Sequence, residues 1–197
     1  MKALIEKSLA DGISYQAYRE LVSKLLSEGK STGPNQTEAL THYSMLNNKR
    51  MDRLDKKITI SESTKTALSK LNQKQTWLVL TEGWCGDAAQ NLPIIHKMAE
   101  ASNQIDLKLV LRDEHLELMD MFLTNGGRAI PKLIALDENL EVLFTWGARP
   151  SIATKMVADY KAAHGKLDDA FKKDLQVWYN KNKGLNLQED FVKLLNP

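Results

Sequence analysis

The side chain best suited to nucleophilic chemistry is Cys85, the only cysteine in 197 residues. The apolar run Trp77–Leu80 before it is rich in aromatic and branched residues and predicts a buried strand. From Asp87 onward, apolar residues at helical spacing predict a helix. Cys85 is therefore expected in the first turn of that helix, where unpaired N–H groups and the helix dipole favour a thiolate.

Two effects on the Cys85 thiol oppose each other. The helix N-terminus favours the thiolate, whereas the negative charge of Asp87, two residues on, disfavours it. We expect Asp87 to point into solvent or to cap the helix, so that the helix effect dominates and Cys85 reacts faster than free cysteine near neutral pH. The alternative is that Cys85 is an inert, buried hydrophobic side chain.

The residues around Cys85 resemble a known motif. The run Trp84-Cys85-Gly86-Asp87-Ala88, with Pro93 eight residues after the cysteine, is similar to the thioredoxin active site, Trp-Cys-Gly-Pro-Cys. Ala129-Ile130-Pro131 resembles the thioredoxin cis-proline loop, and Gly147-Ala148 resembles the glycine before the last helix of that family. These matches occur in the expected order and cover about residues 60–164.

The resemblance implies an α/β, thioredoxin-like fold in which a mixed central sheet of four or five strands is flanked by helices. It implies that Cys85 is the catalytic residue and that the Ile130–Pro131 bond is cis. It also implies that substrate contacts five residues, namely Trp84, Gly86, Asp87, Ile130 and Pro131.

Three positions depart from the family pattern. Ala88 replaces the resolving cysteine, Asp87 replaces the usual proline, and Val79 occupies the place of the buried acid that accepts a proton in thioredoxins. The dithiol reaction is therefore not expected, and only the attacking thiol remains.

The flanks of this region predict helical additions. We expect an N-terminal helical extension over 1–58, a thioredoxin-like domain over 59–165, and a C-terminal helical extension over 166–197 that packs on the core. Asn35, with Glu38 three residues on, predicts a helix start, and Ser61 predicts the cap of a short helix.

Polar residues outside the motif allow two interpretations. Asn47 and Arg50 interrupt the apolar face of a predicted helix, either because they lie at its edge or because they line a polar site near Cys85. The turn Arg112–His115 follows a predicted strand, at the end where α/β proteins place their sites, although a solvated His115 is the simpler expectation.

Three functions are compatible with a single thiol in this context. The first is monothiol exchange, in which Cys85 forms a mixed disulfide with a protein or a low-molecular-weight thiol. The second is a non-catalytic module that binds extended peptide beside Ile130-Pro131. The third is glutathione binding, because Cys85-Gly86-Asp87-Ala88 faintly resembles the Cys-Gly-Phe-Ser motif of monothiol glutaredoxins.

Composition limits the class of protein. Apolar residues make up 43% and charged residues 26% of the chain, and the net charge of +2 comes from interspersed signs, so neither nucleic acid nor membrane is an expected partner. The histidines have no metal-ligand spacing with Cys85, so we expect no metal and no cofactor. A lone cysteine and a charged N-terminus without a signal-like apolar core predict a cytoplasmic protein of undetermined oligomeric state.

Overall fold

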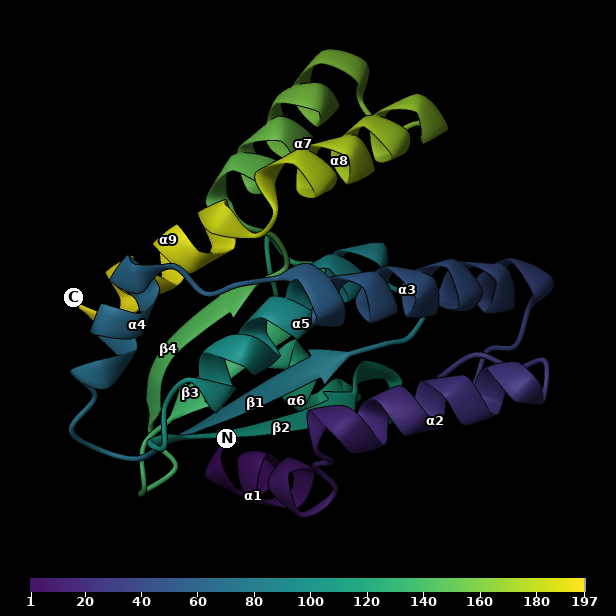
Figure 1. Cartoon of the computed structure of the whole chain (residues 1–197). Coiled ribbons are helices and arrows are strands. Elements are labelled where there is room, and N and C mark those ends of the chain that lie inside the picture. Colours follow the sequence, from purple (N-terminus) through teal and green to yellow (C-terminus); the bar gives the residue numbers. More distant parts are fainter. Residues whose placement is uncertain (197) are drawn as a thin grey trace.

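The fold is organised around a four-stranded sheet in the order β2-β1-β3-β4 (Figure 1). The computed structural model describes residues 1–196 of the chain. The strands are β1 (Gln75–Thr81), β2 (Ile105–Leu111), β3 (Lys132–Leu136) and β4 (Val142–Gly147). β1 runs parallel to β2 and antiparallel to β3, and β3 runs antiparallel to β4. The predicted mixed sheet is thus confirmed.

β1 is the central strand and carries the chain to the cysteine motif. Val79 pairs with Leu109 of β2 on one side and with Leu133 of β3 on the other. The side chains of Trp77–Leu80 are all fully buried, as expected for a strand covered on both faces.

Helices make up most of the remaining chain. They are α1 (Lys2–Ala10), α2 (Tyr15–Ser27), α3 (Glu38–Lys57), α4 (Glu62–Ser69), α5 (Gly86–Glu100), α6 (Leu116–Asp120), α7 (Ser151–His164), α8 (Asp169–Asn182) and α9 (Leu185–Leu195), with the short 3₁₀ helix η1 (Arg112–Glu114). None of these helices, within residues 1–196, is long and apolar enough to cross a bilayer.

The helices cover the sheet in a way that places both flanks near the motif. α3 lies along α5, while α2 contacts both α3 and β2, and α1 contacts β2 and α6 (Figure 1). α9 contacts α4 and α5. Its buried Phe191 packs against aromatic rings of β1 and β4, with ring centroids 5.1 Å from Trp77 and 5.6 Å from Trp146.

The pair α7 and α8 forms a hairpin that projects from the sheet (Figure 1). It has a small apolar core separate from the main one, formed by Ala153, Val157, Phe171, Leu175 and Tyr179. The chain then turns into α9 at Gly184, whose φ of +79° and whose close approach to Ile94 of α5 exclude a larger side chain.

Local capping agrees only in part with the sequence. Ser61 caps α4 by accepting the Thr64 N–H, as predicted. The helix cap predicted at Asn35 is wrong, because α3 begins at Glu38 and is capped by Thr37, which accepts the Leu40 N–H.

Candidate functional site

Cys85 occupies the N-cap of α5, where the sequence places it. Its Sγ accepts the Ala88 N–H at 3.4 Å and lies 3.3 Å from the Ile130 carbonyl oxygen, to which the thiol donates. The Ile130–Pro131 peptide bond is cis. The thiol thus joins the start of α5 to the loop before β3.

The surroundings of the thiol oppose the acidity that the helix N-terminus predicts for it. Only 9% of Cys85 is exposed, and burial together with the Asp87 charge raises the pKa of the thiol to about 12. The Ala88 and Asp87 N–H groups lower that pKa, but by less than burial raises it. Desolvation therefore raises the pKa by more than the helix N-terminus lowers it, and Cys85 is protonated at neutral pH.

The expected position of Asp87 is wrong. Only 11% of its side chain is exposed, and the carboxylate pairs with Arg149 at 2.7 Å and accepts the Tyr179 hydroxyl at 2.8 Å. Burial raises the pKa of Asp87, while Arg149 and Tyr179 oppose that shift. The Tyr179 hydroxyl also accepts an N–H of Asn91 at 3.3 Å, so α8 is fastened to α5 directly beside the motif.

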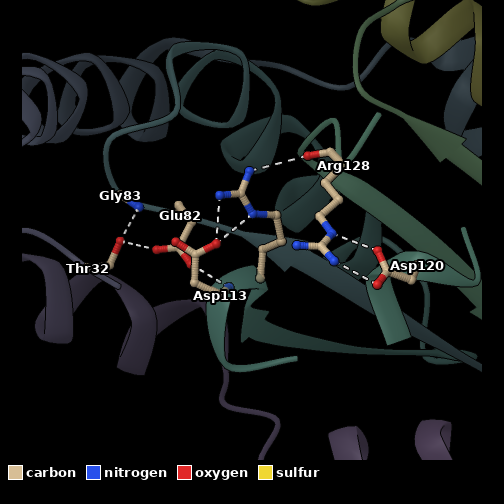
Figure 2. A network of polar contacts seen from close by, with 7 residues as sticks. Thr32, Glu82, Gly83, Asp113, Asp120 and Arg128 are labelled. Atoms are coloured by element: carbon tan, nitrogen blue, oxygen red, sulfur yellow. Dashed lines mark hydrogen bonds and ion pairs between the residues drawn. The ribbon is translucent and has the colours of Figure 1, made fainter. Parts of the chain in front are cut away.

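A buried carboxylate, Glu82, holds the loop that leads into the motif (Figure 2). One of its oxygens accepts the Thr32 hydroxyl and the other accepts the Asp113 N–H at 3.0 Å. The Thr32 hydroxyl oxygen in turn accepts the Gly83 N–H at 2.8 Å. Burial raises the pKa of Glu82, and these two donors oppose the shift.

The same network extends toward the surface (Figure 2). Asp113 pairs with Arg112 at 2.6 Å, and Arg112 donates to the Arg128 carbonyl at 3.3 Å. Arg128 forms two hydrogen bonds with Asp120. The Arg112 guanidinium also lies over the Trp84 ring, 4.9 Å from its centroid, and so orients that ring by a cation–π contact.

The Thr32 hydroxyl can be tested separately from the motif. Thr32→Val removes a partner from both Glu82 and the Gly83 N–H, two buried groups, so we expect the free energy of unfolding to fall by about 2 kcal/mol. Urea denaturation would measure the loss. Thr32→Ser, which keeps the hydroxyl, is the matched control and should lose less than half as much; equal stability of the two variants would contradict the role of this network.

Asn47 and Arg50 lie at the motif rather than at the edge of an apolar face. Asn47 is buried and donates to the Gly83 carbonyl at 3.0 Å, and Arg50 donates to Asn47 Oδ1 at 2.7 Å. Asn47 therefore supports the loop that leads into the motif, and Arg50 lies beside it at the start of α5. The simpler expectation for His115 is wrong, because it is buried and bonds to Ser8 Oγ at 2.9 Å, which ties α6 to α1.

A cleft of about 610 Å³ opens beside Cys85, between α3, the start of α5 and α8. Of the predicted substrate-binding residues, Trp84, Gly86 and Asp87 line it. Ile130 and Pro131 do not line it; both are buried, and the Ile130 carbonyl is occupied by the thiol. The predicted site therefore has an open side, formed by Trp84, Gly86 and Asp87, and a buried side, formed by Ile130 and Pro131.

Sequence reasoning missed several residues of this site. Arg149 reaches it from the loop before α7, and Tyr179 reaches it from α8. Both lie far along the chain, and no local sequence pattern predicts their contact with Asp87. Glu82 carried a signal, because a carboxylate at the end of a buried strand must find hydrogen-bond donors.

Two solved structures share this fold. A protein of unknown function from Pseudomonas aeruginosa aligns with a TM-score of 0.59 and 18% identity, over 77% of this chain and 84% of that one. An HIV epitope scaffold aligns with a TM-score of 0.59 and 16% identity, over 88% of this chain and 96% of the scaffold. At such identities the likeness concerns the fold alone.

Sequence comparison gives a more specific result. No curated protein matches the chain significantly. The family model described as thioredoxin matches residues 33–161, from the loop before α3 into α7, and so includes Cys85 and the cis-proline loop. Because that match spans well over half of the sequence, this protein belongs to the thioredoxin family.

Proposed function

We propose that this protein is a thioredoxin-fold binding module that holds a ligand in the cleft beside Cys85. The observation that carries the proposal is the contrast between the two sides of the motif. The thiol is 9% exposed and bonded to the Ile130 carbonyl, whereas Trp84, Gly86 and Asp87 face a cleft of about 610 Å³. A cleft of that size lies within the range of small-molecule sites.

The chemistry of the thiol supports binding over catalysis. A thiol whose pKa is raised to about 12 has almost no thiolate at neutral pH, and Ala88 supplies no second thiol to release a mixed disulfide. Cys85 therefore serves as a hydrogen-bond donor that positions the loop before β3.

Monothiol exchange is the second candidate, because Cys85 sits at a helix start next to a cis-proline. In that reaction the Cys85 thiolate would attack a disulfide of a protein or a small thiol compound, forming one S–S bond and releasing the partner's other sulfur as a thiol. It requires a conformation in which the thiol leaves the Ile130 carbonyl and becomes exposed, so the reactivity of Cys85 separates the two candidates.

Binding can be tested with a library of small fragments followed by ¹H–¹⁵N NMR. We expect the fragments that bind to shift the Gly86 amide and the Trp84 indole N–H, which lie at the cleft. Trp84→Ala should weaken these fragments about tenfold or more, as expected when an aromatic anchor is removed. Cys85→Ser, whose hydroxyl can still donate to Ile130, should change affinity by less than about twofold.

Two results would contradict the binding proposal. One is a set of fragments that bind elsewhere and leave the cleft resonances unchanged. The other is reduction of a protein disulfide by the wild type, with dithiothreitol present, at a rate that Cys85→Ser abolishes.

A further inference from the structure

The cleft beside the motif carries more positive than negative charge. Four basic side chains and two carboxylates line it, namely Arg50, Arg149, Lys172, Lys173, Asp87 and Asp169. Both carboxylates already have partners, since Asp87 pairs with Arg149 and Asp169 pairs with Lys172. Arg50 and Lys173 are left without a counter-charge among residues 1–196.

Of these two cations, Arg50 is the stronger indication of a ligand, because it is half-buried whereas Lys173 is exposed. Its only side-chain hydrogen bond goes to the neutral amide oxygen of Asn47. Burial, and after it the charge of Arg53, lowers the pKa of Arg50, so no carboxylate in the described chain compensates the loss of solvent around this guanidinium.

The Arg50 guanidinium lies beside the cysteine motif. A Cβ at Gly86 would lie 3.7 Å from Arg50 Nη1, so the guanidinium covers the first residue of α5. A second unpaired donor lies on another wall of the same cleft, because Arg149 Nε is buried and has no partner in residues 1–196, although its Nη2 is bound to Asp87.

We propose that the cleft binds a small organic oxyanion, a carboxylate or a phosphate monoester with an apolar body, whose head group is held by Arg50. The inference rests on the proposed binding function and specifies its ligand. A guanidinium binds such head groups through two parallel N–H donors. The apolar body fits the remaining walls of the cleft, which include Leu40, Tyr43, Trp84, Leu167 and Leu175.

Three aromatic probes of similar shape and one inorganic anion test this assignment by isothermal titration calorimetry on the full chain. They are phenylphosphate, phenylacetate, the neutral isostere phenylacetamide, and inorganic phosphate. We expect both aromatic anions to bind about tenfold or more tightly than phenylacetamide, because a charge-assisted hydrogen bond replaces a neutral one. The ratio of phenylphosphate to phenylacetate affinity tells which head group the site prefers, and inorganic phosphate shows how much the apolar body contributes.

The variants separate Arg50 from general surface charge. Arg50→Gln should weaken the aromatic anions about tenfold or more and leave phenylacetamide unchanged. Arg53→Gln is the matched control, because it removes the same charge three residues along α3, from a side chain that bonds to Asn180 and does not line the cleft; it should change anion affinity by less than about threefold. Lys173→Gln, on the exposed surface of α8, should weaken the anions severalfold and provides a test that does not depend on the folding of Arg50→Gln.

The remaining outcomes distinguish failure of the oxyanion assignment from failure of the binding function. If phenylacetamide binds in the cleft as tightly as phenylacetate, or if Arg50→Gln leaves anion affinity unchanged, the oxyanion assignment is overturned and the binding function stands. If none of the four probes shifts the Gly86 or Trp84 resonances and the fragment library does not either, both proposals fail.

Discussion

Iodoacetamide should alkylate Cys85 about 50-fold more slowly than free cysteine at pH 8. With its pKa raised to about 12, the thiol is only about 0.01% ionised there, against about a quarter for a free thiol of pKa ~8.5. The higher basicity makes the remaining thiolate about 40-fold more nucleophilic, which offsets part of the deficit. Burial of the sulfur slows the reaction further.

The pH profile identifies the cause of the slow reaction. The rate should rise about tenfold per pH unit from pH 7 to 10, because the thiolate fraction is still far from saturation below a pKa of about 12. The protein unfolded in guanidinium chloride is the control and should react as free cysteine does. A folded protein that reacts at the free-cysteine rate, with a plateau above pH 9, would contradict the buried thiol and favour monothiol exchange.

Arg149→Met should lower the free energy of unfolding by about 3 kcal/mol at pH 7.5. The change leaves the Asp87 carboxylate buried without its cation, and Arg149 keeps 26% of its side-chain surface exposed, which argues for the lower end of the range for broken buried pairs. Chemical denaturation by urea measures the loss. Asp87→Asn in the same chain is the compensating change, since the amide can still accept the Tyr179 hydroxyl; the double variant should recover about half of the stability.

The loss in Arg149→Met should depend on pH in a defined direction. Burial raises the pKa of folded Asp87 above its unfolded value, so ionising this carboxyl lowers the free energy of unfolding. That destabilisation is absent below the unfolded pKa and grows as the pH rises through the folded pKa. Removing Arg149 raises the folded pKa further, so the loss should be smaller at pH 4.5 than at pH 7.5. The double variant, which lacks the titrating carboxylate, should show no such difference; an equal loss at both pH values would contradict the role of the ion pair.

The sequence predicted the parts of the site that depend on local patterns. The apolar run before Cys85 required a buried strand, and the helical spacing after Asp87 required a helix, so the cysteine fell at the junction of β1 and α5. Ser61 was predicted as a cap because its hydroxyl acts on its own helix. The order of the motifs predicted the thioredoxin fold.

The environment of the thiol could not be predicted in this way. It depends on the burial of the sulfur against the Ile130 carbonyl, 45 residues away in sequence, and on the charge of Asp87, which Arg149 and Tyr179 hold beside the motif. Without these contacts, the helix N-terminus was the strongest visible influence on Cys85, and the predicted pKa shift had the wrong sign. Asn35 was mistaken for a cap for a related reason, because the nearby Thr37 is equally able to accept a backbone N–H.

The α7–α8 hairpin has an apolar core of its own, separate from the core of the sheet and α5, and we expect the two to unfold as separate cooperative units. The sheet and α5 form the larger unit, with most of the buried side chains, and the hairpin forms a smaller one, joined to it at the motif by Tyr179, Gln176 and Arg149. A unit with few buried contacts opens at a lower free energy than global unfolding. We therefore expect the hairpin to open more often than the sheet unfolds, and the motif lies where the two units meet.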